Sequence, residues 1–202
     1  MHDHDAFLIA CYSEHPLVAQ LRAELSQRGL LGRKLVLGIF EASILHALAL
    51  VDSSCTDPGA ATANRWGIVS TGKVWEGLLA SGVERFLVGA SAGAGAGAGV
   101  IGAQRFAGVA TTGLNAIDLH TLPREEVLQS MKKAVRKLLG PTDGGGKVTA
   151  VCLGCAGMAG LAEAVNDVGA ELGYPPGELR VIDGVKAGVL ILQGLLKAKY
   201  IY

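Results

Sequence analysis

The chain has 202 residues, of which 50% are hydrophobic, 18% charged and 5% aromatic, and its formal net charge is zero. This balance argues against disorder and lacks the basic surface of a nucleic-acid-binding protein, so no nucleic acid is expected as a partner. Because no apolar run reaches roughly 18 residues and the acidic residues 1–5 lack the basic region of a signal peptide, we expect a cytoplasmic protein without a membrane partner.

Apolar runs alternate with amphipathic stretches along the chain, and this alternation predicts right-handed β-α-β units, a parallel sheet and hence an α/β fold. The predicted strands cover residues 6–10, 35–40, 66–70, 85–88, 106–111, 148–153 and 179–182. The predicted helices cover residues 16–28, 41–51, 124–139, 161–172 and 184–199, and a further helix begins within 72–79. Residues 52–64 and 141–146 predict a linker and a break between elements.

An Ala/Gly run occupies residues 91–99, and its end, Gly97 to Gly102, has the glycine spacing of the dinucleotide-binding fingerprint. That fingerprint opens a helix directly after a strand, whereas this stretch leads into a strand-like segment. We therefore interpret the run as a flexible loop and expect no dinucleotide cofactor.

Two cysteines follow predicted strands in different parts of the chain. Cys11 comes after the strand at 6–10, and Cys155 comes after the strand at 148–153. In open α/β sheets the carboxyl ends of the strands face the ligand crevice, and backbone N–H groups at a helix start favour a thiolate. The pair predicts two thiols that face each other across a cleft and act as base and acid at a carbon centre. A lone cysteine would more often be inert, so this interpretation depends on the pair.

The other cysteines predict no further chemistry. Cys152 and Cys155 have C-x-x-C spacing, but Cys152 belongs inside a strand, whereas a redox pair lies at a helix start. Cys55 is a loop thiol without an assigned role. No set of metal ligands is visible in the sequence, so no metal is expected.

Two hydroxyl-rich turns form a second matched pair, Ser70-Thr71-Gly72 and Thr111-Thr112-Gly113. Each closes a predicted strand, and its hydroxyl and backbone donors suit a carboxylate or an amide. The alternative, in which the hydroxyls cap the helix that follows, stays open. Glu41 is interpreted as a favourable charge in a first helical turn, and His120 as a structural or rim residue.

These residues lie in segments that resemble the Asp/Glu/hydantoin racemase family, in particular its hydantoin-racemase branch and the fungal members of that branch. The most telling segment is Leu-Gly-Cys-Ala-Gly-Met at residues 153–158. Six segments match in family order, at residues 5–13, 38–42, 67–73, 108–116, 153–158 and 181–185.

The resemblance implies two pseudosymmetric three-layer lobes with parallel sheets and a site between them. Residues 1–51 with 179–202 would form the first lobe, and residues 52–178 the second. Family members normally begin with a further strand and helix that carry an Asn-Pro-Asn-type segment, and this chain begins almost directly at the Cys11 strand. The first lobe is therefore expected to be truncated at its N-terminus, with one wall of the pocket missing.

The resemblance also implies a racemase that uses no cofactor and acts on hydantoins, allantoin or related amino-acid derivatives, with Cys11 and Cys155 as the catalytic pair. Its partners would be a small-molecule substrate and further copies of the chain in a homo-oligomer. Two alternatives stay open: a related decarboxylase or isomerase, and a truncated, inactive member that is a binding module or a non-functional fragment. The expected substrate-binding residues are Tyr12, Ser13, Ser70, Thr71, Gly72, Thr111, Thr112, Ala156 and Gly157.

Overall fold

The computed structural model describes residues 4–51, 64–88, 105–140 and 146–198, and every structural statement below concerns these ranges. Predictions for the linker up to residue 63, the Ala/Gly run at 91–99, the break at 141–145 and Cys55 lie outside the described residues.

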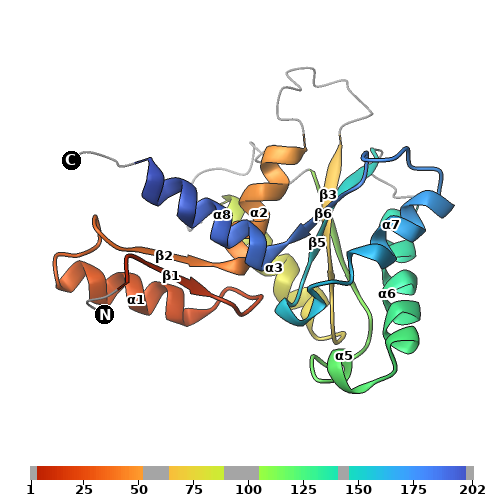
Figure 1. Ribbon diagram of the computed structural model, residues 1–202, viewed down its shortest axis with the longest axis horizontal. Helices are drawn as coiled ribbons and strands as arrows, with labels where there is room; N and C mark the ends of the chain where they lie inside the picture. Colours follow the sequence, from red (N-terminus) through yellow and green to blue (C-terminus); the bar gives the residue numbers. More distant parts are fainter. Residues whose placement is uncertain (1–3, 52–63, 89–104, 141–145, 199–202) are drawn as a thin grey trace.

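The described residues form strands that pair in parallel in two sheets, which confirms the predicted α/β class (Figure 1). The smaller sheet pairs β1 with β2, and the larger has the order β4-β3-β5-β6. The strands are β1 Ala6–Ile9, β2 Leu35–Gly38, β3 Arg65–Ser70, β4 Phe106–Thr111, β5 Val148–Leu153 and β6 Arg180–Asp183. The helices are α1 Pro16–Gln27, α2 Ile39–Leu50, α3 Trp75–Val88, α5 Asp118–Thr121, α6 Arg124–Leu139, the 3-10 turn η1 Ala156–Met158, α7 Ala162–Glu171 and α8 Gly184–Lys197.

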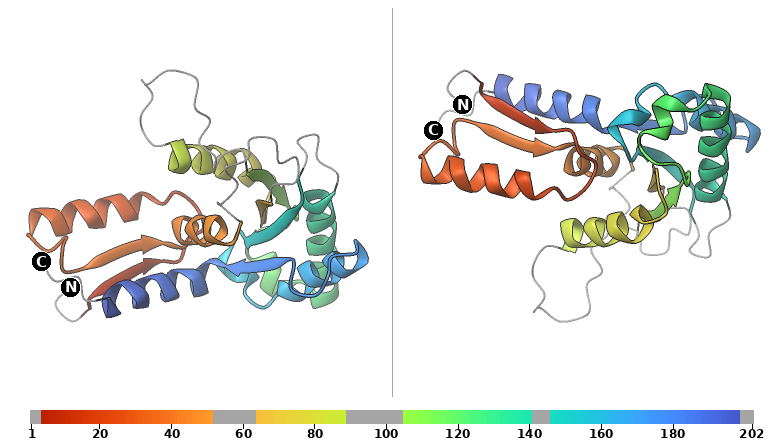
Figure 2. Two further views of the ribbon diagram at one scale, coloured as in Figure 1. Left: turned by 90° about the horizontal axis from the view of Figure 1, so that it is seen from above. Right: turned by 90° about the horizontal axis from the view of Figure 1, so that it is seen from below.

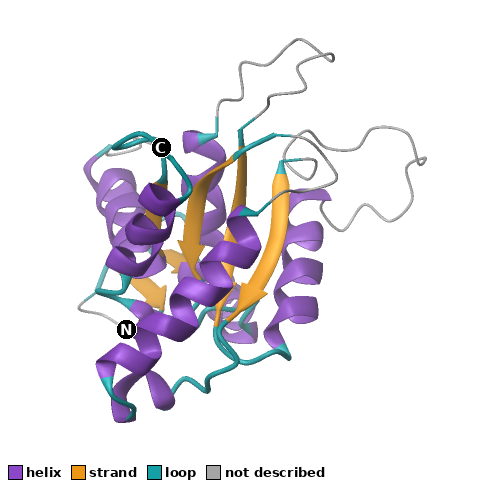
Figure 3. Cartoon of the chain, turned by 90° about the vertical axis from the view of Figure 1, so that its right-hand side faces the viewer, coloured by secondary structure: helices purple, strands orange, loops and turns teal. Residues whose placement is uncertain are grey.

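The larger sheet is the middle layer of three (Figure 3). Side chains that alternate along its strands enter two separate cores, as the period of two in a strand requires. Ile68 and Cys152 point to the core formed with α2, α3 and α8, whereas Val69 and Val151 point to the core formed with α6 and α7. Both faces of the sheet are therefore covered by helices, as is usual for parallel strands.

The smaller sheet lies between α1 on one face and α8 with α2 on the other (Figure 2). α8 approaches β1 so closely that a Cβ on Gly188 would lie 2.5 Å from Leu8 Cδ1. α1 begins at Pro16, where a missing N–H costs nothing, and the His15 side chain accepts the backbone N–H of Leu17. α8 thus connects the last strand of the larger sheet to the surface of the smaller one.

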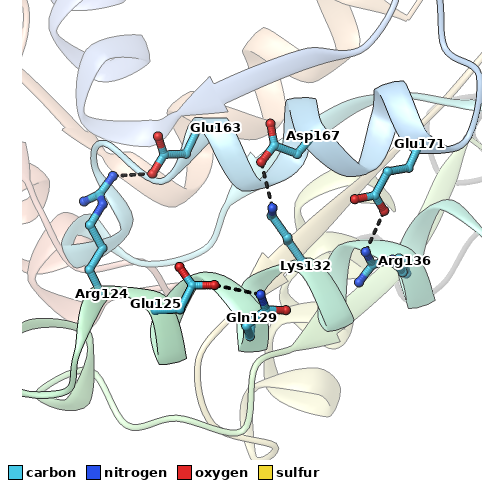
Figure 4. A network of polar contacts seen from close by, with 8 residues as sticks. All are labelled: Arg124, Glu125, Gln129, Lys132, Arg136, Glu163, Asp167 and Glu171. Atoms are coloured by element: carbon cyan, nitrogen blue, oxygen red, sulfur yellow. Dashed lines mark hydrogen bonds and ion pairs between the residues drawn. The ribbon is translucent and has the colours of Figure 1, made fainter.

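A surface row of ion pairs holds α6 against α7 (Figure 4). Arg124 pairs with Glu163, Lys132 lies 2.8 Å from Asp167, and Arg136 lies 2.5 Å from Glu171. Exposed pairs of this kind contribute only about 0–1 kcal/mol each. The row therefore fixes the relative register of the two helices, while the buried core beneath them supplies the stability.

Two strand predictions need correction. The predicted strand at 85–88 is wrong, because these residues form the last turn of α3, whose Leu79 and Val83 are buried at helical spacing. The prediction places the last strand in the first lobe, whereas β6 pairs with β5, with Cys152 opposite Ile182. The side chains of Val181 and Ile182 also pack into the two cores of the larger sheet. The division at residue 179 stays a prediction, but β6 itself belongs to the larger sheet.

Tyr12 joins the segment after Cys11 to the core of the larger sheet. Its hydroxyl lies 2.7 Å from Ser43 Oγ, and the Ser43 hydroxyl donates to Phe40 O at 2.9 Å. Cys152 of β5 lies beside this pair, with its Sγ atom 3.7 Å from Ser43 O, and burial raises the pKa of Cys152 to about 12. Tyr12 is only 6% exposed and has a structural role in the core, while its contact with substrate stays a prediction.

We expect Tyr12→Phe to lower the free energy of unfolding by about 1 kcal/mol, because it deletes one buried hydrogen bond. Urea titration followed by circular dichroism measures this change. Tyr174→Phe is the matched control, since the Tyr174 hydroxyl makes no hydrogen bond within the described ranges, and it should change stability by less than about 0.5 kcal/mol. Equal effects of the two changes would contradict the structural role of Tyr12.

Candidate active site

The carboxyl ends of β4, β3 and β5 lie side by side at one edge of the larger sheet, and their turns are bonded to one another. The N–H of Thr112 donates to Ser70 O at 2.9 Å, and the N–H of Gly113 donates to Thr71 O at 3.1 Å. On the other side of β3, the N–H of Gly154 donates to Val69 O at 2.7 Å. This edge is where ligands bind in open α/β sheets, so the structure brings the predicted turns together as expected.

Gly154 determines where the chain leaves β5. A Cβ at this position would lie 2.8 Å from Ser70 Cβ and 2.9 Å from Val69 O, so any other residue would push the turn off β3. The Ser70 hydroxyl, 1% exposed, donates to Gly154 O at 2.8 Å. Ser70 was predicted to bind substrate, and the structure instead shows that its hydroxyl holds the turn that presents Cys155.

Cys155 is half-buried and is followed by a single 3-10 turn. The sequence predicted a helix directly after this cysteine, but the next helix, α7, begins only at Ala162. Met158 is fully buried and anchors the short turn, and its N–H donates to Cys155 O at 3.0 Å. Ala156 and Gly157 between them are half-buried, so their backbone lies at the surface of the site.

The hydroxyls of Thr111 and Thr112 make hydrogen bonds within the protein. The Thr112 hydroxyl accepts the N–H of Leu114 at 3.2 Å, and the Thr111 hydroxyl donates to Glu76 Oε1 at 3.0 Å. Hydrogen bonds from Lys137 and Thr111 hold the pKa of Glu76 below its usual value. Thr71 is 3% exposed. The Thr111 and Thr112 hydroxyls thus make structural bonds but do not cap the helix that follows, so the predicted alternative is not what the geometry shows. Their substrate contact stays a prediction.

Gly72 closes the β3 turn at the same edge. It is half-buried, and its carbonyl accepts the N–H of Trp75 at 3.0 Å. This bond leads the chain into α3. Gly72 therefore lies at the surface of this edge, and its contact with substrate stays a prediction.

Cys11 lies on the loop between β1 and α1 and is exposed. Its Sγ atom lies 3.5 Å from Ser13 Oγ, and the N–H of Ser13 donates to Cys11 O at 3.0 Å. The loop is fixed on one side by Tyr12 in the core and on the other by Glu14, whose carboxylate lies 2.6 Å from Arg85 of α3. In Figure 1 and in the view from below in Figure 2, this loop and η1 lie next to each other in the middle of the molecule.

Glu41 is the one buried carboxylate near this region that makes no hydrogen bond through its Oε2 atom within the described residues. The side chain folds over Gly38, where a Cβ would lie 2.2 Å from that oxygen. Burial raises the pKa of Glu41 above its usual value. The interpretation of Glu41 as a favourable charge in a first helical turn therefore does not account for the burial of its carboxylate.

His120 lies near Cys155, and the sequence did not predict this position. Its Nε2 atom lies 3.0 Å from the point where a Cβ on Gly157 would lie, and Cys155 Sγ lies 3.6 Å from the same point. Thirty-five positions separate His120 from Cys155 in the sequence, so no spacing rule connects them. The contact between α5, which follows β4, and η1, which follows β5, brings them together.

A separate cavity of about 460 Å³ lies among α2, β6, α7 and α8, with His46, Asn166, Arg180 and Lys186 in its lining. Neither Cys11 nor Cys155 lines it. Within the described ranges, no three His, Cys, Asp or Glu side chains converge on a possible metal position. None of the described helices is long and apolar enough to cross a membrane.

Comparison with known sequences gives a consistent set of relatives. The profile of the family described as Asp/Glu/Hydantoin racemase matches residues 1–192. An uncharacterized protein of Schizosaccharomyces pombe is 34% identical over 193 residues, which are 96% of this chain and 63% of that protein. A second uncharacterized S. pombe protein is 26% identical over 193 residues, which are 96% of this chain and 64% of its own. The chain therefore spans less than two thirds of the length of these relatives.

Comparison with solved structures shows the fold. An allantoin racemase from Klebsiella pneumoniae superposes with a TM-score of 0.60 at 24% identity, over 98% of this chain and 61% of that one. A glutamate racemase from Bacillus anthracis gives a TM-score of 0.57 at 14% identity, over 98% of this chain and 59% of that one. The parallel α/β arrangement of this chain is thus shared with racemases.

We expect Gly154→Ala to destabilise the protein by about 1–3 kcal/mol, because the added Cβ meets backbone and core atoms that have no room to move. Gly77→Ala is the matched control: Gly77 lies within α3 with nothing within 4 Å of the added Cβ. That change should stabilise the helix by about 0.5–1 kcal/mol. Thermal and urea unfolding of both variants measure the difference, and a neutral Gly154→Ala would contradict the close approach of the β5 turn to β3.

Proposed function

Because this chain belongs to the Asp/Glu/hydantoin racemase family, we propose that it racemises hydantoins, allantoin or related amino-acid derivatives with two cysteines and without a cofactor. The observation that carries the proposal is the placement of Cys155 at the edge where three strand turns meet, with the Cys11 loop beside the turn that follows it (Figure 1). Both thiols have access to solvent, as a pair that meets a small-molecule substrate requires.

The chemistry needs a base on one face of a carbon and an acid on the other. A hydrogen on carbon beside a carbonyl is weakly acidic, and in a hydantoin ring the enolate is further delocalised beside an acylated nitrogen. A thiolate removes this hydrogen as a proton, and a thiol on the opposite face returns another, so the two sulfurs exchange roles with each turnover. One cysteine is therefore a thiolate while the other is a thiol, and substrate handedness decides which.

The developing enolate oxygen needs hydrogen-bond donors that are already in place. The backbone N–H groups of Ala156 and Gly157 donate to no acceptor within the described residues, and both residues reach the surface next to Cys155. Ser13 supplies a half-buried hydroxyl beside Cys11. We assign enolate stabilisation to these groups, and we assign to the buried Ser70 and Thr71 the support of the turns. A homo-oligomeric state and a cytoplasmic location stay predictions.

Replacing either thiol should stop racemisation. We expect Cys11→Ser and Cys155→Ser each to lower the rate of racemisation by at least about 100-fold, the smaller end of what a general acid or base contributes. Each variant should still exchange deuterium into one enantiomer only, a different enantiomer for each. Polarimetry on hydantoins and allantoin, with exchange followed by NMR, makes both measurements.

The control for these variants is Cys152→Ala, which removes a buried thiol that lies outside the proposed chemistry and should keep the activity of the folded protein. Near-normal racemisation by either serine variant would rule out the two-thiol mechanism. Deuterium exchange without racemisation in the unchanged protein would favour a one-thiol isomerase or decarboxylase.

The thiols should also differ in reactivity. Cys11 and Cys155 should alkylate near neutral pH and be protected by substrate, whereas Cys152 should not react, since burial shields it and raises its pKa to about 12. Iodoacetamide labelling mapped by mass spectrometry compares the three in one sample. Labelling of Cys152 as fast as that of Cys155 in the folded protein would contradict this assignment.

A further inference from the structure

An imidazole and a thiol lie on either side of Gly157. His120 Nε2 lies 3.0 Å from the place of a Cβ on Gly157, and Cys155 Sγ lies 3.6 Å from it. Nε2 and Sγ therefore cannot be farther apart than these two distances together. A glycine at 157 leaves the space between the two side chains open, because even one methyl group would be in tight contact with Nε2.

The fold holds His120 in this place through its neighbours. α5 begins with a local turn in which the Asp118 carboxylate accepts the N–H of Asn115 at 2.6 Å. The His120 N–H donates to Ile117 O at 3.0 Å, and the half-buried Leu119 packs into the core of α6 and α7. Leu119 Cδ1 also lies 3.3 Å from the place of a Cβ on Gly157. The backbone on both sides of the imidazole is thus fixed against η1.

The imidazole of His120 is exposed and makes no hydrogen bond or ion pair within the part of the chain that the structure describes. The elements packed against α5 are η1 and α6. Their charged or titratable groups are Cys155 just before η1 and Arg124, Glu125 and Glu126 in the first turn of α6. Arg124 is paired with Glu163 and Glu125 accepts from Gln129. Cys155 is therefore the partner that the geometry offers to Nε2.

We propose that His120 is a positioning residue that acts through Cys155 and makes it the more readily ionised of the two catalytic thiols. The neutral imidazole, protonated at Nδ1, accepts the thiol proton at Nε2, which leaves a thiolate beside an imidazolium. The thiolate then removes the substrate proton and becomes a thiol, while the Cys11 thiol protonates the opposite face of the carbon and becomes a thiolate. The proton held by the imidazolium returns to Cys11 through solvent, since both side chains are exposed, and this restores the starting state. This inference rests on the proposed function and adds that the two catalytic thiols, Cys155 and Cys11, are not equivalent.

Among the described residues, Cys11 makes no hydrogen bond with an imidazole. Its sulfur lies 3.5 Å from the hydroxyl of Ser13. His15, four positions further on, uses Nδ1 to accept the N–H of Leu17 at 3.2 Å and so serves as the cap of α1. A change at His120 should therefore affect Cys155 and leave Cys11 unaltered, which gives every experiment an internal control.

The test measures the rate of iodoacetamide labelling of each cysteine against pH in His120→Gln, His120→Ala and the unchanged protein. We expect labelling of Cys155 near pH 7 to fall about tenfold in both variants, as expected when a thiolate loses one neighbouring positive charge. Labelling of Cys11 should not change. Added imidazole should restore the Cys155 rate in His120→Ala, because the exposed site is open to it, and not in His120→Gln. His46→Gln, in the separate cavity, is the control and should change neither rate.

A second variant tests the geometry without removing the imidazole. Gly157→Ala adds a methyl group 3.0 Å from Nε2 and 3.6 Å from Sγ, so it should displace the imidazole and lower the Cys155 rate in the same direction. If racemisation is measurable, His120→Gln should change kcat by different factors for the two enantiomers at saturating substrate, while kcat/KM changes by the same factor for both because the equilibrium constant is one.

Unchanged Cys155 labelling in all the His120 variants would overturn the inference, even for an active racemase. A protein that racemises none of the substrates but shows the His120 effect on Cys155 would overturn the proposed function and retain the inference about this pair.

Discussion

The turn after β5 depends on the close approach of a residue without a side chain to the neighbouring strand. Gly154 lies against Ser70 and Val69 at distances that leave no space for a Cβ, and the Ser70 hydroxyl closes the gap by donating to Gly154 O at 2.8 Å. This contact, at the residue directly after β5, fixes where Cys155 leaves the sheet. Because β4 bonds to the other side of β3, the same contact also sets the position of the loop that leads to α5. This one packing arrangement therefore positions Cys155, the N–H groups that follow it and the imidazole of His120.

The second thiol is held by a different interaction, a buried aromatic anchor. Tyr12 follows Cys11 directly, and its ring packs edge-on to Phe40 at 5.6 Å while its hydroxyl reaches Ser43. Because the Cys11 loop is short and Tyr12 is buried, the loop loses most of its conformational entropy on folding. It therefore loses little more when a ligand binds. The two cysteines thus come from equivalent places in two sheets but are positioned by unequal means, a glycine turn in one case and a tyrosine anchor in the other.

The sequence predicted most of the strands and helices because buried parallel strands have continuous apolar runs and the helices have a clear period of 3.6. The helix at Arg124–Leu139 and the strand at Val148–Leu153 agree with the structure at both ends. The errors fall where local pattern and tertiary context differ: Phe86 and Leu87 are apolar enough for a strand but continue α3. The partner of β6 was not predictable from pattern alone, because an apolar four-residue strand fits either sheet.

The same limit applies to the site, where residue types were predictable and their orientations were not. Hydroxyls at strand ends suggested ligand binding, yet Ser70, Thr111 and Thr112 use them on neighbouring backbone or on Glu76. Apart from these hydroxyls, the N–H groups of Ala156 and Gly157 beside Cys155 donate to no acceptor within the described residues. Backbone N–H groups can bind a carbonyl oxygen of any substrate. They do not select the side chain of the substrate, because they do not contact it. Under the proposed function, these donors would bind the carbonyl groups of a ring substrate, and selection of the substituent would fall to the rest of the pocket wall.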